Sequence, residues 1–303
     1  MQISKMSRKQ IVTIMTGSSN SGSACIHELY SRYSDKVHVR AAFRSADKAK
    51  PLKDKYPDLE VFVGIDANKP ETMEAAFTGA DSALIVTPHD PKIDLIKNND
   101  AELTANMINT AVECGVKYLV YVGSFTVNCA DTIKIIGARF VPSEKLLKEL
   151  GEKNLVKWTS LRGGFFMENL PYMFRNSLKN ESAIRFADYP IVPVDTRDIG
   201  KSGAACLANP ENHYGKCYEM HGPETYTGQK FADLFTKIIG RPITWIKVTE
   251  EDAKKMPLAM YEIFQHFSTH GEKATPYTDD VKKLTGQWGT FEKFVHDHMS
   301  EFN

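Results

Sequence analysis

The chain of 303 residues is 42% hydrophobic and carries 38 basic and 38 acidic side chains, so its formal net charge is zero. This balance excludes a general electrostatic attraction to nucleic acid or to an anionic membrane, and no apolar run approaches the roughly 20 residues of a membrane helix. The first ten residues lack the apolar core of a signal peptide. We therefore expect a cytoplasmic protein without a membrane partner or a direct nucleic-acid partner, and the oligomeric state stays open.

The spacing of cysteines and histidines indicates neither a metal site nor a disulfide framework. The five cysteines form no C-x-x-C pair, which favours reduced, buried thiols in an intracellular protein. His296 and His298 are two residues apart, so they would lie on different faces of a helix. We expect no bound metal.

Strand-like and helix-like segments alternate through the first half of the chain. Apolar runs predict strands at 11–15, 37–43, 60–63, 82–86, 118–122 and 158–161. Helices are predicted at 24–33, 46–56 and 70–77, over a long segment that stops at Gly115, and at 143–150. Because the strand runs are apolar throughout rather than alternating, they indicate a parallel sheet that helices cover on both faces.

The pattern changes after Gly163. Residues 165–174 are rich in aromatic side chains. Helices are predicted at 196–207, with Asp195 or Thr196 as N-cap, and at 227–239. Strands are predicted at 217–220 and 243–248. We predict one α/β unit over 1–303. It contains a Rossmann-type, doubly wound parallel sheet over 10–163 and a smaller C-terminal α/β lobe, mainly 164–303, with some segments returning to the core.

A loop of small residues joins the first predicted strand to the first predicted helix. The ideal G-x-x-G-x-x-G reads here as Gly17-x-x-Asn20-x-x-Ser23, or one loop residue is missing and Gly22 is the last glycine. We prefer the second interpretation, because Gly22 then enters the helix and Leu29 takes a core position. Asn20 would replace the middle glycine, since asparagine is the non-glycine residue that adopts a left-handed backbone most readily. The alternative is an ordinary strand–helix loop. The residues expected to bind a pyrophosphate are Gly17, Ser19, Asn20, Ser21 and Gly22.

Basic residues follow the second predicted strand, where NAD sites usually carry an acid. Arg44 is followed one helical turn later by Lys48. A guanidinium with an ammonium suits a ribose 2′-phosphate, so NADP(H) is favoured over NAD(H). The alternative is a pair of solvated surface cations. Asp66, after the third strand, would bind the adenine amino group or would be a loop or capping residue.

The later strands end in further candidates. Thr87 and Pro88 would border the ribose and nicotinamide, and His89 would donate to a substrate or simply be solvated. Ser124 stands where short-chain reductases place a hydroxyl that binds the substrate oxygen. The usual acid is a Tyr four residues before a Lys, but Val141 precedes Lys145 here, which argues against carbonyl reduction by that dyad.

Two glycines and two phenylalanines follow the sixth predicted strand. The glycines let the chain pass close to a ligand, and Phe165 and Phe166 would flank a planar ring. The alternative is an aromatic pair within the core.

Several segments together resemble the NmrA-like group of atypical short-chain dehydrogenases/reductases, which includes NADPH-sensing regulators and reductases. They are TGSSNSG, VRAAFRS, VGID, GADSALIVTP, AVECGVKYLVYVGS, WTSLRGGFFMEN, VDTRDIG and YEMHGPETYT, and they run along nearly the whole chain. The resemblance implies a Rossmann core that binds NAD(P)(H) and a smaller lobe that forms the substrate cleft. It assigns the glycine loop to the pyrophosphate, Arg44 and Lys48 to the 2′-phosphate, and Thr87 and Pro88 to the ribose.

The same resemblance assigns residues 165–169, including Asn169, to the nicotinamide and substrate side. It matches Ser143-Glu144 to a Ser/Thr-Glu pair of the family. Ser124, Ser143 and Lys145 are the catalytic candidates. We expect an NADPH-dependent reductase of a quinone-like or other planar electrophile. The alternatives are a non-catalytic NADP(H) sensor that acts through a protein partner, and a scaffold that binds no dinucleotide.

Overall fold

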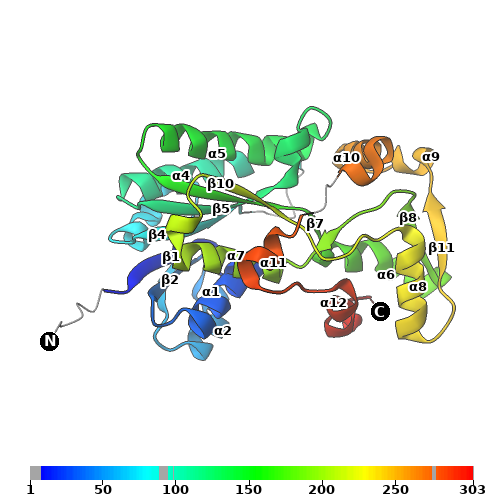
Figure 1. The fold of residues 1–303 in the computed structure, drawn as a ribbon, viewed down its shortest axis with the longest axis horizontal. Coiled ribbons are helices and arrows are strands. Elements are labelled where there is room, and N and C mark those ends of the chain that lie inside the picture. The colour runs from blue at the N-terminus through cyan, green and yellow to red at the C-terminus, as the bar shows by residue number, and fades with distance from the viewer. Residues whose placement is uncertain (1–7, 89–94, 98, 275–277, 303) are drawn as a thin grey trace.

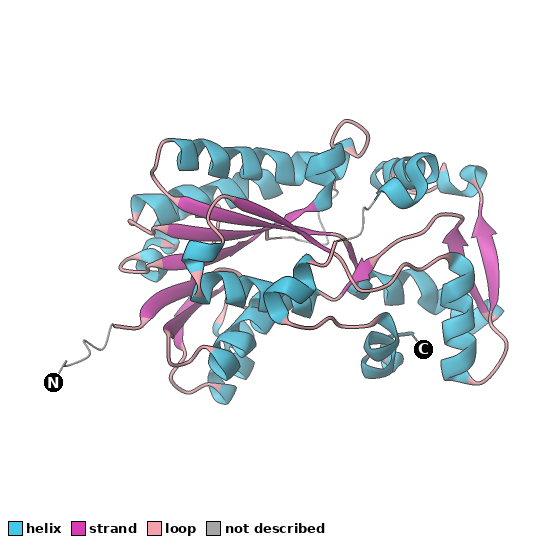
Figure 2. Ribbon diagram, in the orientation of Figure 1, coloured by secondary structure: helices cyan, strands magenta, loops and turns pink. Residues whose placement is uncertain are grey.

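The structure is a computed structural model that describes residues 8–88, 95–97, 99–274 and 278–302. A large sheet with helices above and below it occupies one end of the molecule, and a smaller lobe around β8 (Ala183–Ala187) and β11 (Thr244–Val248) occupies the other (Figure 1). Figure 2 shows the strands of the large sheet converging toward the smaller lobe.

Seven parallel strands form the large sheet, in the order β10-β6-β5-β4-β1-β2-β3. Their bounds are β1 Gln10–Ile14, β2 Val37–Phe43, β3 Glu60–Val63, β4 Ser82–Val86, β5 Tyr118–Ser124, β6 Lys157–Gly163 and β10 Lys216–Met220. The chain runs outward in one direction from β1 to β3 and in the other from β4 to β10. This arrangement confirms the predicted doubly wound sheet. Ligands of such sheets bind at the carboxyl ends of the strands next to the reversal, here between β1 and β4.

Helices cover both faces of this sheet, which is why every residue of β4 and β5 is buried. One face carries α1 (Asn20–Arg32), α2 (Ala46–Lys55) and α7 (Thr196–Ala208), with α11 (Asp280–Thr285) against α7. The other face carries α3 (Glu74–Phe77), α4 (Asp100–Glu113) and α5 (Lys134–Glu152). The apolar residues of each face form a separate core, as expected for a three-layer α/β fold.

The smaller lobe has an aromatic core of its own. The ring of Phe174, on α6 (Leu170–Glu181), meets the rings of Phe186, Phe231 and Phe235 edge-on. The remaining elements are α8 (Gly228–Ile239), α9 (Glu250–Ala253), α10 (Leu258–His270), α12 (Phe291–Asp297), α13 (Met299–Phe302), and the parallel pair β7 (Phe165–Phe166) and β9 (Pro193–Val194). β8 and β11 pair in parallel, so the predicted smaller α/β lobe is confirmed.

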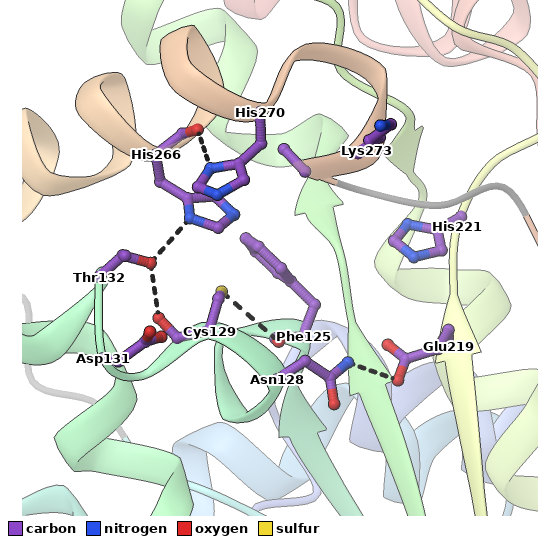
Figure 3. Close-up of a pocket in the computed structure, with 11 residues that line it drawn as sticks. Phe125, Asn128, Cys129, Asp131, Thr132, Glu219, His221, His266, His270 and Lys273 are labelled. Carbon is purple, nitrogen blue, oxygen red and sulfur yellow. Dashed lines mark hydrogen bonds between the residues drawn. The ribbon is translucent and has the colours of Figure 1, made fainter.

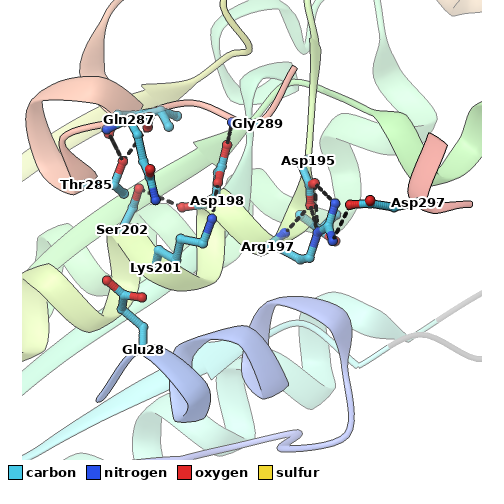
Figure 4. A network of polar contacts seen from close by, with 12 residues as sticks. Glu28, Asp195, Arg197, Asp198, Lys201, Ser202, Thr285, Gln287, Gly289 and Asp297 are labelled. Atoms are coloured by element: carbon cyan, nitrogen blue, oxygen red, sulfur yellow. Dashed lines mark hydrogen bonds and ion pairs between the residues drawn. The ribbon is translucent and has the colours of Figure 1, made fainter. Parts of the chain in front are cut away.

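Polar contacts tie the carboxyl-terminal segment to α7 (Figure 4). Asp198, which is 1% exposed, accepts a hydrogen bond from the Gly289 amide at 2.5 Å and pairs with Lys201 at 2.8 Å. Arg197 joins Asp195, the N-cap of α7, to Asp297 at the end of α12, with N–O distances of 2.6 and 3.5 Å. The chain therefore returns from the smaller lobe to the large sheet and back again.

Several local predictions agree with the structure and several differ. Gly115, at which the sequence predicts the end of a helix, has a φ of +87° and directly follows the C-cap of α4. The helix expected at 143–150 is the end of the longer α5, which contains Pro142. α1 begins at Asn20, four residues earlier than expected. The sequence pattern predicts neither β8 nor α6, because their apolar faces pack on segments far along the chain.

The five cysteines are all unpaired thiols. Burial raises the pKa of every one of them, and it raises the pKa of Cys129 to about 11. Among the described residues, no group of three or more His, Cys, Asp or Glu side chains is arranged to hold a metal ion. No helix in the described part of the chain has the length and apolar character needed to cross a membrane.

Candidate functional site

The loop from β1 to α1 leaves backbone donors open at the helix N-terminus. Ser19 is the N-cap of α1, and its Oγ accepts a hydrogen bond from the Gly22 amide at 3.0 Å. Three other amides at this end donate to no residue that the structure describes: Ser18, Asn20 and Ser21. Such amides, together with the helix dipole, form a site for an anion.

The two glycines of the loop are needed for close packing. A Cβ at Gly17 would lie 2.9 Å from Cζ of Phe43, and a Cβ at Gly22 would lie 2.6 Å from the carbonyl oxygen of Thr16. The Gly17 amide also donates to the Ala42 carbonyl at 2.9 Å, which joins the loop to β2. These contacts bring the start of α1 close to the carboxyl ends of the strands.

Asn20 does not adopt the left-handed backbone that the sequence suggests. It is the first residue of α1, and the residue with positive φ is Thr16, at +57°. Because the loop is short, the chain turns before Gly17, and the Thr16 hydroxyl stabilises this turn by donating to the Val86 carbonyl at 3.2 Å. Gly22 lies inside α1 and Leu29 is fully buried, as the interpretation with one missing loop residue expects.

Arg44 and Lys48 lie just after the carboxyl end of β2, next to the glycine loop. Both side chains are exposed, and neither forms an ion pair or hydrogen bond with a described residue. Asp66 lies after β3, where its Oδ1 accepts from the amide and the side chain of Asn68 at 3.0 and 3.1 Å. The Asn68 amide and side chain hold the pKa of Asp66 below its usual value, with a smaller contribution from the positive charge of Arg44. This edge therefore presents two cations that have no partner of their own among the described residues.

Polar side chains follow β4 and β5 at the same edge of the sheet. Thr87 is half-buried and accepts from the Thr104 hydroxyl at 3.2 Å, and Pro88 is buried. Ser124 is buried, and its Oγ accepts from the amide and hydroxyl of Thr126 at 3.2 and 3.0 Å. The Ser124 hydroxyl hydrogen has no acceptor among the described residues, so it is free to donate. His89 lies outside the described residues.

The two candidates on α5 lie in opposite environments. Ser143 is 1% exposed, and its Oγ makes no hydrogen bond of acceptable geometry with a described residue. Burial raises the pKa of the neighbouring Tyr121 to about 12, which keeps that phenol protonated. The side chain of Lys145 is 75% exposed and pairs with Glu149 at 3.7 Å. The structure thus places Ser143 in the interior and Lys145 on the solvent face of the helix.

Glu144, next to Ser143, is the centre of a buried ionic cluster. It pairs with Arg162 at 2.6 Å and Lys148 at 2.8 Å, and it accepts from the Ser160 hydroxyl at 2.9 Å. Burial opposes its ionisation, but the hydrogen bonds from Arg162 and Lys148 outweigh that effect and lower the pKa of Glu144 to about 2. Glu144 is therefore ionised at neutral pH and is fully engaged within the protein.

The two phenylalanines of β7 face different cores. Phe166 packs on the core of the large sheet, and its ring would lie 2.6 Å from a Cβ at Gly163. Phe165 packs against the core of the smaller lobe, and Asn169 is exposed at the start of α6. The two rings therefore do not face one another across a common gap.

Glu168 connects this segment to α7. Its carboxylate accepts hydrogen bonds from the amide of Thr196 at 3.0 Å and from the Thr196 hydroxyl. Burial raises the pKa of Glu168. The contact holds the start of α7, the helix that packs on α1, beside the end of β7.

A cavity of about 450 Å³ opens near the carboxyl ends of β5, β6 and β10 (Figure 3). One wall comes from the turn that follows β5, including the 3-10 helix η2 (Phe125–Cys129). The others come from the end of β10 and from α10 with the 3-10 helix η5 (Gly271–Ala274). The polar residues that line it include Asn128, Thr132, Glu219, His221, His266 and His270.

The three histidines differ in their surroundings. His221 is 1% exposed, its Nδ1 has no hydrogen-bond partner among the described residues, and burial lowers its pKa to about 4. Nδ1 of His270 lies 2.8 Å from the carbonyl oxygen of His266, so it must carry a hydrogen, and Nε2 is then the basic nitrogen of the neutral ring. Nδ1 of His266 lies 2.8 Å from the Thr132 hydroxyl.

No sequence motif points to any of these three histidines. His221 lies more than 40 residues before His266 and His270, and nothing local to it indicates that the three meet. The one available signal is the spacing of His266 and His270, which puts both on one face of a helix.

The chain as a whole is similar to a known family of proteins. The profile of the NmrA-like family matches residues 8–295. The NAD(P)H azoreductase of Xenophilus azovorans is 26% identical over 304 residues, which cover 96% of this chain and 99% of that protein.

Two solved structures share the fold. The NADPH-dependent quinone oxidoreductase QOR2 of Escherichia coli, complexed with NADPH, has a TM-score of 0.79 at 20% identity, covering 95% of this chain and 99% of its own. The negative transcriptional regulator NmrA, in complex with NADP, has a TM-score of 0.76 at 18% identity, covering 97% of this chain and 96% of its own.

Proposed function

The chain belongs to the NmrA-like family, and from that membership we propose that it binds NADP(H) and reduces a planar acceptor of the quinone or azo type. The observation that carries the proposal is the pair Arg44 and Lys48, two exposed cations without a partner among the described residues, beside the open N-terminus of α1. The similarity to the azoreductase, which extends over nearly the full length of both chains, supports a reductase.

The residues at this edge fit a dinucleotide phosphate. The free amides of Ser18, Asn20 and Ser21 would bind the pyrophosphate, and the glycines beside them let it approach. Arg44 and Lys48 would bind the 2′-phosphate, because a guanidinium and an ammonium match its charge and its oxygen acceptors. Asp66, Thr87 and Pro88 would border the adenine and the ribose. The bound coenzyme would supply a hydride.

Within this proposal the protein positions the acceptor and stabilises the oxygen or nitrogen that gains charge. Ser124, whose hydroxyl hydrogen is free and lies at the end of β5, would donate a hydrogen bond to that atom. Water would supply the proton, since Val141 stands where a catalytic tyrosine is expected. Lys145 takes no part, because it points to solvent. The residues 165–169 would border the nicotinamide through their backbone and the side chain of Asn169.

The test is a titration with NADPH, NADP⁺ and NADH followed by nicotinamide fluorescence, and then turnover of NADPH with a quinone and an azo dye. We expect tighter binding of NADPH than of NADH and oxidation of NADPH that depends on the acceptor. A protein that binds none of the three would be a scaffold, and the proposal would fail.

A second function is a non-catalytic NADP(H) sensor that acts through a protein partner. The absent tyrosine and the fold shared with the regulator NmrA support it. Binding that differs between NADPH and NADP⁺, without turnover of any acceptor, would favour the sensor over the reductase. For either function we propose a cytoplasmic location, supported by five unpaired thiols.

A further inference from the structure

We propose that β11 is an interface between two copies of this chain, which extend the β8–β11 sheet across a twofold axis into a four-stranded sheet. Figure 1 shows β11 at the outer end of the smaller lobe, with β8 on its inner side. The inference rests on the backbone edge of β11 and is independent of the proposed reductase function.

The outer edge of β11 carries unpaired backbone groups. Among the described strands its one partner is β8, which it follows in parallel along its whole length. The Thr244 amide donates to the Ser182 carbonyl at 3.0 Å, so the backbone of Thr244 points toward β8. Because inward and outward groups alternate along a strand, the N–H and C=O groups of Trp245 and Lys247 point away from β8. None of these four groups forms a hydrogen bond with a described residue outside that ladder.

The strand has few of the features that usually protect an exposed edge, such as proline or unpaired charge. Its five residues, TWIKV, include no proline. The charge of Lys247 is already compensated by Asp188 of the same chain, at 2.7 Å. Trp245, Ile246 and Val248 are half-buried apolar residues. β11 is therefore suited to binding another strand through its main chain.

A second copy can pair with this edge in one favourable register. A twofold axis makes the two strands antiparallel, and the outward groups of one must meet the outward groups of the other. With the axis at Ile246, Trp245 of each copy lies opposite Lys247 of the other. Every unpaired group of Trp245 and Lys247 then has a partner, which gives four hydrogen bonds between the copies.

The neighbouring registers need backbone groups that are already bonded. An axis at Trp245 would pair Lys247 with Ile243, whose amide and carbonyl both bond to the Thr236 hydroxyl, at 2.9 and 3.3 Å. An axis at Lys247 would place the two lysines opposite each other. It would also use Thr249, whose amide donates to the carboxylate of Asp252 at 3.2 Å.

The side chains of β11 agree with the axis at Ile246. Ile246 lies opposite Arg185 of β8, which is exposed, so it belongs to the outer face of the small sheet. There it would contact Ile246 of the second copy in a close, non-hydrogen-bonded pair. On the other face, Trp245 of each copy would lie opposite Lys247 of the second, an aromatic ring beside an ammonium group.

Opposite charges stand at equal distances on the two sides of Ile246. Arg241, five residues before it, is exposed and donates to the Ser182 hydroxyl and the Leu178 carbonyl, but forms no ion pair with a described residue. Glu251, five residues after it, is exposed and forms no ion pair with a described residue. The antiparallel pairing brings Arg241 of each copy toward Glu251 of the other. The surface is therefore complementary to itself in charge as well as in hydrogen bonding.

Cysteine trapping tests the register. In Ile246→Cys the two thiols would face each other across the axis, at a spacing that suits a disulfide. Thr244→Cys is the matched control on the same face, because its thiol would lie roughly 14 Å along the strand from its counterpart. Under mild oxidation, Ile246→Cys should become a covalent dimer on a non-reducing gel. Thr244→Cys and the wild type should stay monomeric there.

Sedimentation velocity over about two decades of protein concentration tests the association itself. The wild type should form a dimer that dissociates on dilution. Lys247→Pro should be monomeric with an unchanged melting temperature, because it removes a donor that points away from β8.

Charge variants of the flanking pair provide a second test by the same measurement. Glu251→Arg should raise the dimer dissociation constant by about fivefold, as expected for two surface ion pairs. Adding Arg241→Glu should restore it. Glu211→Arg, an exposed glutamate of the 3-10 helix η4 (Pro210–Asn212), is the control and should change nothing. A wild type that is monomeric at every concentration, or equal disulfide yields from the two cysteine variants, would overturn the inference.

Discussion

In the proposed function, the preference for NADPH over NADH depends on the side chains of Arg44 and Lys48. Arg44→Ala should weaken NADPH binding by about 10- to 100-fold, the cost of losing a charge-assisted hydrogen bond, and should leave NADH binding nearly unchanged. The measurement is nicotinamide fluorescence with both coenzymes. Lys50→Ala is the control, because Lys50 lies on α2 and pairs with Asp54 at 2.6 Å. An equal loss for NADPH and NADH would contradict the assignment of Arg44 to the 2′-phosphate.

The buried carboxylate of Glu144 should make stability depend on pH. Glu144→Gln should lower the free energy of unfolding by about 3 kcal/mol at neutral pH, since it leaves Arg162 without its closest partner. The pKa of Glu144 is lowered from 4.5 to about 2 in the folded protein. Its contribution to the free energy of unfolding is therefore complete at pH values above the unfolded pKa. It is lost as the pH falls from about 4.5 toward 2.

Urea unfolding of the wild-type protein and of Glu144→Gln at neutral and acidic pH tests this prediction. The gap between wild type and Glu144→Gln should narrow as the pH falls. Glu149→Gln, on the same helix, removes an exposed pair of 3.7 Å and should cost only about 0.5 kcal/mol. A gap that stays constant with pH would mean that Glu144 is not ionised in the folded state.

Some residues of the candidate site can be placed in the fold from sequence patterns alone, and others cannot. The cations Arg44 and Lys48 follow a strand directly, so strand prediction alone places them at the carboxyl edge of the sheet. The positive φ of Thr16 could not be predicted, because it depends on how close α1 lies to β1, and β-branched residues rarely adopt it. The unpartnered nitrogen of His221 becomes visible only when β10 is placed beside β6.

Among the elements, α1 and α7 lie unusually close together. A Cβ at Gly200 would lie 2.7 Å from Cβ of Ala24 and 2.8 Å from the amide nitrogen of Cys25. Gly200→Ala should therefore separate the helices, with a net loss of about 1–3 kcal/mol in the free energy of unfolding. It should also weaken NADPH binding, because the first turn of α1 moves with the contact.

Gly203→Ala on the same helix is the matched control. Its Cβ would lie 3.1 Å from Cδ1 of Leu84, the end of a flexible side chain. The helix propensity of alanine, better by about 1 kcal/mol than that of glycine, should offset much of this milder crowding. Denaturant unfolding and NADPH titration of both variants measure the difference. Similar effects of the two substitutions would show that the α1–α7 contact has no special role.

The strands of the large sheet could be predicted because each is a short apolar run bounded by turn residues. β2, β3 and β4 have the predicted bounds. β8 could not be predicted, because its one partner among the described strands is β11, about 60 residues later, and the local pattern reveals no neighbour for it. The helix α6 could not be predicted for a related reason. The sequence shows only an enrichment in aromatic residues over 165–174, and the buried face of α6 is set by α8 and β8.

At the scale of the whole molecule, the carboxyl-terminal segment joins the two lobes. α11 packs on α7 beside the large sheet, the Gly289 amide binds Asp198, and Phe291 then enters the aromatic core of the smaller lobe. The division of the chain at residue 163 stays a prediction. The cavity between η2, β10 and α10 takes walls from both parts, since β10 belongs to the large sheet, η2 follows its strand β5, and α10 belongs to the smaller lobe.

The raised thiol pKa values have a consequence for the proposed reduction of quinones, because quinones alkylate thiolates. Cys129 lies in the wall of the cavity, and its pKa of about 11 leaves roughly one thiol in ten thousand ionised at pH 7. Incubation with naphthoquinone without NADPH should leave the intact mass unchanged over a time in which free cysteine is fully modified. A covalent adduct on Cys129 would contradict this expectation. Protonated sulfur would let the protein hold a reactive electrophile without being inactivated by it.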